Sequence, residues 1–300
     1  MPPRKLILNC PLSPGDILTM TTAVKSLHDR YPGDFITDVR TPCPAIWENN
    51  PHITPLADDT EKIDMHYPLI DMCNQEPVSF INGYTQYLGE QLHWPLSATI
   101  NRPALYLSDL EKENTGPKLS TPYFLINAGV KSDYTAKQWP VEYYQHIVNT
   151  CSHITWVQIG EENPYHIHIP LDNVTNLVGK TNLRELICLA YFASGGLGPV
   201  TLLQHLCAAW DKPYVCILGG REPATWVQYP LQHTLHTIGL LDCCRFGGCW
   251  KSRVVPLNDG DKKDEDLCTY PVITFQKPVG KCMAKIHPHD VINVINRISI

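Results

Sequence analysis

The sequence has no apolar run of roughly 18–20 residues, the length that a membrane-spanning helix needs. Its opening residues, Met1-Pro-Pro-Arg-Lys5, lack the apolar segment of a secretory signal and lead directly into a short strand-like run. We therefore expect a protein without a membrane span that works in the cytoplasm.

Positive charge is scarce and dispersed. Lys and Arg number 24 against 30 Asp and Glu, which gives a net charge of −6, and no stretch concentrates basic residues. A nucleic-acid partner would require a basic stripe, so the composition argues against one. The apolar fraction of 43% and the charged fraction of 18% are those of a globular chain with one large or two medium domains.

Short apolar runs alternate with amphipathic segments, which predicts an α/β fold with parallel strands. One strand–loop–helix unit starts with a strand at Lys5–Asn9, and a second starts with a strand at Tyr123. The polar segment Leu107–Thr121 is the best linker between the two units. The predicted domains are a Rossmann-like domain at 1–120, a second Rossmann-like domain at 121–240, and a cysteine-rich segment with a closing helix at 241–300.

Several local elements follow from the same patterns. We predict an apolar helix at Ile17–Arg30, further strands at Ile53–Ala57 and Ile63–Ile70, and a glycine loop from Gly195. A helix at Pro288–Ile298 should close the chain.

The region that follows the glycine loop suits a bound phosphate. Thr201 is placed to cap a helix that runs to Trp210, and helix N-termini offer N–H groups and a positive dipole end. The apolar strand Tyr214–Leu218 then opens into Gly219-Gly220-Arg221, where the backbone can approach a ligand and a guanidinium can pair with phosphate. An ordinary α/β turn with glycines for geometry explains the pattern equally well.

Three segments together resemble glycosyltransferase family 9, the heptosyltransferases. They are Ser13–Asp16, Lys137–Pro140 and Thr201–Glu222, which follow the family's order and spacing. The resemblance implies a GT-B fold, in which two Rossmann-like domains face each other, the first binding the acceptor and the second a nucleotide-sugar. It implies an inverting glycosyltransferase that moves a sugar, heptose in the first place, from a nucleotide diphosphate donor such as ADP-heptose.

The resemblance also assigns roles to residues. Asp16 would be the general base that takes a proton from the acceptor hydroxyl, although an Asp in front of a helix is more commonly just its cap. Positive groups and a helix N-terminus would replace the catalytic metal of other transferases. The implied acceptor-side loop residues are Ser13 and Gly15, and the implied donor-binding residues are Lys131, Lys137, Thr201, His205, Gly219, Gly220, Arg221 and Glu222.

Other functions stay open at this point. Val200 stands where the family usually has Asp, and Leu202 where it has Gly, so the chain would be a subfamily variant. A non-catalytic nucleotide-sugar sensor or scaffold, and a GT-B nucleotide-sugar epimerase, are the alternatives. The acceptor, whether a glycan, a protein or a small metabolite, cannot be identified from the residues.

The 12 cysteines divide into two groups. Most lie singly in apolar segments and are predicted to be small core residues, whereas five fall after Leu241 in polar, loop-like sequence. Four thiolates match a tetrahedral zinc or iron site, and this tail resembles the iron finger of autotransporter heptosyltransferases. The alternative is a set of free thiols. The predicted structural ligands are Cys244, Cys249, Cys268 and Cys282, with Cys243 as the alternative to Cys244. His166 and His168 are predicted to be surface residues.

Overall fold

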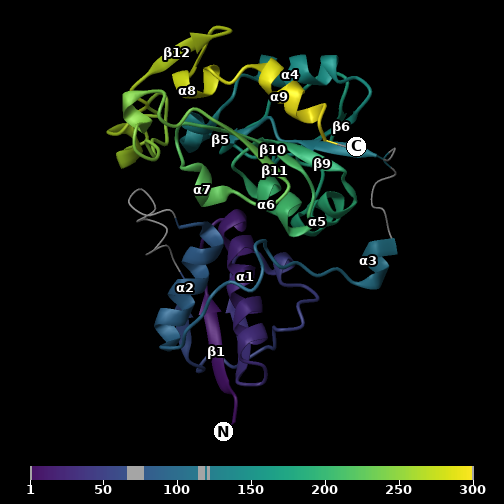
Figure 1. Cartoon of the computed structure of the whole chain (residues 1–300), viewed down its shortest axis with the longest axis vertical. Helices are drawn as coiled ribbons and strands as arrows, with labels where there is room; N and C mark the ends of the chain where they lie inside the picture. Colours follow the sequence, from purple (N-terminus) through teal and green to yellow (C-terminus); the bar gives the residue numbers. More distant parts are fainter. Residues whose placement is uncertain (1, 66–77, 114–118, 120–121, 299–300) are drawn as a thin grey trace.

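The structure, a computed structural model, describes residues 2–65, 78–113, 119 and 122–298. Two parallel α/β sheets occupy the two halves of the chain (Figure 1). Among the helices in these ranges, none combines the length and the apolar character that a bilayer span requires. The predicted strand Ile63–Ile70 begins as a short strand, and from residue 66 onwards it lies outside the described residues.

The first half is built on β1 (Arg4–Asn9), which lies between β2 (Phe35–Arg40) and β3 (Lys62–Asp64) in a parallel sheet. The apolar face of this sheet is covered by α1 (Pro14–Arg30), which packs against α2 (Phe80–Leu92). Leu6, Leu8, Ile17 and Leu18 are fully buried in this core.

The predicted strand Ile53–Ala57 is wrong, because only a single bridge joins Ile53 to Thr37. Beyond this bridge, the backbone hydrogen-bonding groups of Leu56 pair with side chains and not with the backbone of a neighbouring strand. The Leu56 N–H donates to Asp38 Oδ2 at 2.7 Å, and the Leu56 carbonyl accepts from Arg40 at 2.9 Å.

The second half contains a six-stranded parallel sheet in the order β11-β10-β9-β4-β6-β8. Helices α4 (Val141–Thr150) and α9 (Pro288–Ile295) cover one face, and α5 (Leu183–Phe192) and α6 (Leu202–Ala209) cover the face towards the first half (Figure 1). The strands are β4 (Tyr123–Ile126), β6 (Thr155–Gln158), β8 (Thr175–Asn176), β9 (Gly195–Pro199), β10 (Tyr214–Gly219) and β11 (Gln232–His236).

Strand β9 corrects the predicted glycine loop. Its sequence, Gly-Gly-Leu-Gly-Pro, occupies the centre of the sheet and is completely buried. A Cβ at Gly195 would lie 2.6 Å from the ring of Phe124, and one at Gly196 would lie 3.0 Å from Tyr214. Glycine is therefore required here because aromatic side chains of the neighbouring strands fill the space, which local propensity does not reveal.

The remaining elements are short. The closing helix α9 packs on α4 and β10 of the second half. The polar linker contains one helical turn, α3. These elements are α3 (Asp109–Glu113), β5 (Val130–Lys131), β7 (His166–Ile167), α7 (Ala224–Val227), β12 (Pro271–Thr274), β13 (Lys277–Gly280), α8 (Lys281–Ala284) and 3₁₀ turns at Pro44–Ile46, Ser132–Lys137, Asp242–Cys244 and Lys262–Asp264.

Two arginines tie the halves together. Arg184 of α5 binds both oxygens of Glu111, at 2.6 and 2.9 Å, and donates to the Tyr106 carbonyl at 2.7 Å. Arg102 donates to the Ala209 carbonyl at 2.7 Å. Bidentate pairs of this kind fix orientation as well as distance, so they set how the halves face each other.

Candidate active site

A cleft of about 1210 Å³ lies between the two halves. Its walls come from the carboxyl ends of β1, β4, β6 and β9, because parallel strands all direct their carboxyl ends to one edge of a sheet. From the first half it is lined by Ser13, Pro14, Gly15, Asp16 and Phe80.

The first wall is the N-terminus of α1. The helix begins at Pro14, earlier than predicted, and Ser13 is its N-cap in an extended conformation. Asp16 stands at the third helical position, where its Oδ2 accepts from the Ser13 N–H at 3.2 Å. The carboxylate therefore belongs to a capping box and also lines the cleft, so its structural and chemical roles are compatible.

The opposite wall carries polar groups from three strand ends. Lys131 reaches across the cleft to the Ser13 hydroxyl, with 3.3 Å between Nζ and Oγ. Thr201 occupies the N-cap position of α6, but its side chain makes no capping bond. Its hydroxyl instead accepts from the Asn127 amide at 3.2 Å, which corrects the expected capping role.

His205 lies in the first turns of α6, between the two halves. Its ring is 4% exposed, and Nδ1 lies 2.7 Å from the hydroxyl of Tyr229. Phe80 of the first half meets the ring edge-on at 5.8 Å between centroids. Burial, followed by the charge of Lys137, lowers the pKa of His205 to about 3, so the imidazole is neutral at pH 7.

Lys137 belongs to a buried group of three charges. Its Nζ lies 2.7 Å from Glu222 Oε1 and 3.4 Å from the Val200 carbonyl, and Arg221 binds the same carboxylate oxygen. Burial lowers the pKa of Lys137 despite the attraction of Glu222. For Glu222 burial acts in the opposite sense, but the two cations outweigh it and hold the carboxyl pKa below its ordinary value. One negative charge between two positive charges leaves this group with a net positive charge, and Lys137 is the member that lines the cleft.

The structure does not bring Gly219, Gly220, Arg221 or Glu222 into the lining of the cleft. Arg221 donates through Nε to the Lys251 carbonyl at 2.7 Å and lies 5.4 and 5.6 Å from the rings of Tyr134 and Trp250. In this structure the guanidinium contacts the cysteine-rich tail, and its contact with a phosphate stays a prediction.

The two glycines, Gly219 and Gly220, also contact the cysteine-rich tail. Gly219 has a positive φ of 68°, and a Cβ there would lie 2.3 Å from Met283 Sδ. A Cβ at Gly220 would lie 3.0 Å from Cys244 Sγ. The close approach that the glycines permit is to α8 and the cysteines, not to a ligand.

Several residues that line the cleft were not assigned to it by the sequence analysis, among them two glutamates and two histidines. Glu161 and Glu162 follow Gly160 at the end of β6, and this strand-end position was the available signal. His166 and His168, predicted to be surface residues, are half-buried and also line the cleft. The His168 ring fills the space beside Gly129 and Gly160, each of which would place a Cβ 2.1 Å or less from it, and burial lowers its pKa to about 4.

The tail supplies the last part of the cleft wall. Arg253, 1% exposed, binds both oxygens of Asp259 at 2.8 Å and also binds Asp264. Among the tail cysteines, Cys244 points to the carbonyls of Thr237 and Leu241, at 3.5 and 3.4 Å. Within the described ranges, no three His, Cys, Asp or Glu residues are arranged to hold a metal ion.

A carboxylate on one wall of the cleft therefore faces lysines and the N-terminus of α6 on the other wall, an arrangement that suits an anionic ligand. The profile of glycosyltransferase family 9 (heptosyltransferase) matches residues 84–243, just over half of the chain. The chain therefore belongs to glycosyltransferase family 9, and it is a glycosyltransferase. No curated protein matches it significantly.

Solved structures agree with this at the level of the fold. E. coli ADP-heptose LPS heptosyltransferase II is 16% identical with a TM-score of 0.61, and the match covers 98% of each chain. The iron-containing dodecameric glycosyltransferase TibC from enterotoxigenic E. coli is 18% identical with a TM-score of 0.65, over 99% of this chain and 76% of that one. E. coli heptosyltransferase WaaC with ADP-2-deoxy-2-fluoro heptose is 12% identical with a TM-score of 0.61, over 98% and 100%. The predicted GT-B fold is confirmed.

Proposed function

We propose that this chain transfers heptose from ADP-heptose to an acceptor hydroxyl, with inversion at the anomeric carbon. The observation that carries the proposal is the placement of Asp16 across the cleft from Lys131, Lys137, Thr201 and His205. The donor identity is supported by two relatives, WaaC bound to ADP and TibC bound to ADP-D-β-D-heptose.

We assign different chemical roles to the residues on the two walls of the cleft. The leaving diphosphate would be held by Lys131, Lys137 and His205. Cations and fixed hydrogen-bond donors stabilise the negative charge that develops on a leaving group without a proton transfer. Asp16 would accept the proton of the attacking hydroxyl, as a general base within hydrogen-bond reach does.

We also propose the domain limits 1–120, 121–240 and 241–300, which the separate sheets of the first two segments support.

Donor binding gives the first test of this proposal. ADP should bind the wild-type protein, and Lys131→Ala should weaken it by about 1 kcal/mol or fivefold to tenfold, because an exposed lysine loses one charge-assisted bond to phosphate. Isothermal calorimetry measures both dissociation constants.

The matched control for Lys131 is Lys212→Ala. Lys212 lies in the turn before β10, at the opposite end of the sheet from the cleft, so its loss should leave ADP affinity unchanged. Binding of UDP or GDP in preference to ADP would show that the proposed donor is wrong.

Although the described residues are not arranged to hold a metal ion, we further propose that Cys243, Cys249, Cys268 and Cys282 come together around a structural iron or zinc ion when it binds. Cys243 replaces Cys244 because the Cys244 thiol is already directed to backbone carbonyls. The sulfurs of Cys282 and Cys268 both lie beside Gly280, 3.4 and 3.7 Å from the point where a Cβ of this glycine would stand. Thiolates suit either metal, and the relative TibC contains iron.

The metal is tested by elemental analysis. Purified protein should hold about one iron or zinc per chain, and chelation should lower the melting temperature, since metal binding contributes directly to folding of such segments. Cys268→Ser should abolish the metal, whereas Cys244→Ser and the distant Cys188→Ser should retain it. Metal-free protein of undiminished stability would remove this part of the proposal.

A further inference from the structure

We propose that Tyr229 is a positioning residue whose hydroxyl fixes the proton of neutral His205 on Nε2, the nitrogen that faces the α1 N-terminus. This inference rests on the proposed function for its catalytic consequence, although the tautomer itself can be measured independently. Neither the sequence patterns nor the family resemblance singles out Tyr229.

The hydrogen bond to Tyr229 decides between the two tautomers. A neutral imidazole has one donor nitrogen and one acceptor nitrogen, and the bond made by one determines the other. Nδ1 lies 2.7 Å from the Tyr229 oxygen. Burial, followed by the nearby Asp16 carboxylate, raises the pKa of Tyr229, so the phenol keeps its proton. A phenol is a strong donor and a weak acceptor, so it donates to Nδ1, and the imidazole proton resides on Nε2.

The other edge of the ring faces the cleft. A Cβ built on Gly15 would lie 3.2 Å from His205 Cδ2 and 3.6 Å from Nε2, which places this edge against the first turn of α1. Gly15 immediately precedes Asp16, and both line the cleft with His205. The Nε2–H bond therefore points into the region where the donor diphosphate and the attacking hydroxyl would meet.

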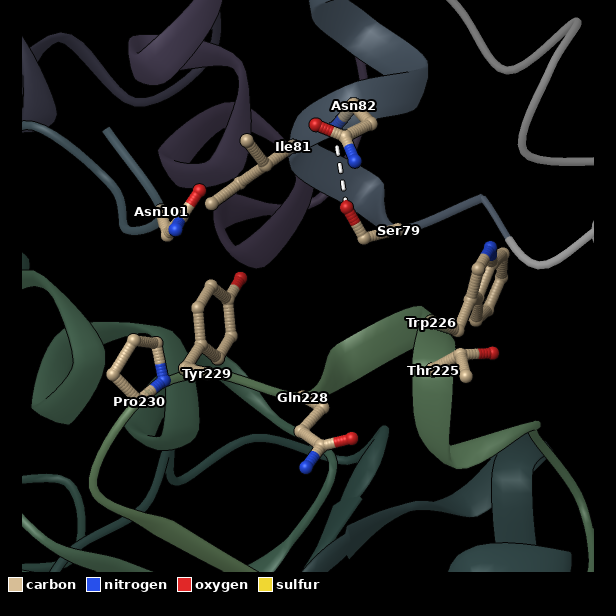
Figure 2. A pocket seen from close by; sticks show the side chains of 9 residues that line it. All are labelled: Ser79, Ile81, Asn82, Asn101, Thr225, Trp226, Gln228, Tyr229 and Pro230. Atoms are coloured by element: carbon tan, nitrogen blue, oxygen red, sulfur yellow. Dashed lines mark hydrogen bonds between the residues drawn. The ribbon is translucent and has the colours of Figure 1, made fainter. Parts of the chain in front are cut away.

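Tyr229 is held rigidly enough for this task. It is 5% exposed and packs with Ile81 of α2 and Ala208 of α6 in a small cluster where the halves meet. Figure 2 shows its ring rising from the segment after α7 towards Ile81, with the hydroxyl at the far end and Gln228 and Pro230 below it. The same residue also lines a second cavity of about 370 Å³, together with Asn82 and Asn101.

The expected chemical effect lies in the transfer step. A hydrogen-bond donor that is already oriented, here the Nε2–H group of His205, need not reorganise when charge develops on the leaving diphosphate. Without the phenol, Nδ1 can hold the proton, and the acceptor nitrogen would then face the diphosphate and repel it. The loss should therefore appear mainly in kcat and not in the KM for the donor.

The test compares Tyr229→Phe with the wild type in two measurements. Nitrogen-15 NMR of histidine-labelled protein, with the signal assigned through His205→Gln, should show Nε2–H in the wild type and a mixture of tautomers in the variant. The kcat should fall by roughly 10–100-fold with little change in KM. Tyr123→Phe is the matched control, since it removes a buried hydroxyl that donates to the Leu189 carbonyl at 2.8 Å, away from the cleft.

Tyr123→Phe should lower the melting temperature but leave the tautomer and kcat unchanged. The wild-type spectrum alone can overturn the inference, because protonated Nδ1 would contradict it whether or not Tyr229→Phe folds. An unaltered tautomer and kcat in folded Tyr229→Phe would overturn it as well. If no sugar transfer is found, the spectra still test the tautomer, so failure of the proposed function is distinguishable from failure of this inference.

Discussion

Replacing Asp16 by asparagine should reduce turnover by about 10²–10⁴-fold, the contribution typical of a general base. The variant keeps the size of the side chain and an oxygen that can accept from the Ser13 N–H, a bond of 3.2 Å in the wild type. It cannot take a proton from the acceptor hydroxyl. Donor affinity should change little, because the proposed phosphate contacts come from the facing wall. Steady-state kinetics with ADP-heptose, together with the melting temperature, measure these effects.

Two further variants separate catalysis from capping. Asp16→Ala removes both functions, so it should lose turnover and also about 1 kcal/mol of stability. Asp29→Asn, in the last turns of the same helix and outside the cleft, should keep full turnover. Near-wild-type turnover in Asp16→Asn would show that the carboxylate is only part of the helix cap.

Replacing Glu222 by glutamine should cost about 3–5 kcal/mol of unfolding free energy, the penalty for removing one partner of a buried ion pair. Glu222 is 2% exposed and lies between Lys137 and Arg221, so the variant leaves two cations facing each other without their common anion. Glutamine has nearly the same volume, which excludes a cavity as the cause. Urea denaturation at pH 7 gives the difference, and Glu162→Gln, an exposed position, should stay within about 0.5 kcal/mol.

The pH dependence provides a second signature of this ion group. The pKa of Glu222 is held below its ordinary value of 4.5 in the folded protein. The stability that the ionised carboxylate contributes is therefore complete above pH 4.5 and is lost as the pH falls through the pKa of the folded state. The stability gap between wild type and Glu222→Gln should therefore narrow on acidification below about 4.5. A gap that is small at pH 7, or that widens in acid, would contradict the structural role assigned to Glu222.

The sequence was sufficient to predict the parts of the site that depend on strand ends. Asp16, the pair Lys131 and Lys137, and His205 come from three separate parts of the chain, in the segments that follow the parallel strands β1, β4 and β9. Strands of this kind share one carboxyl edge, so the cleft residues could be brought together from element order alone.

The parts that could not be predicted depend on distant packing. Arg221 looks like a phosphate ligand in its own segment, but Lys251 and Trp250, about thirty residues further on, decide what its guanidinium meets. Strand β9 consists largely of glycine because Phe124 and Tyr214 occupy the space beside it. His168 enters the cleft because two strand-end glycines leave room for its ring. In each case the residues that decide the local structure lie elsewhere in the sequence, beyond the segment from which the prediction was made.

The central claim is tested most directly by mass spectrometry of the products formed from ADP-heptose. The purified protein is incubated with this donor and a panel of lipopolysaccharide core sugars, polypeptides and small polyols, with Asp16→Asn in parallel. We expect ADP and an acceptor enlarged by one heptose residue in equal amounts, both strongly reduced in the variant. Bound donor that is never consumed would indicate a sensor or scaffold, and donor recovered with an altered sugar would indicate an epimerase. Either result would contradict the assignment of this chain as a heptose transferase.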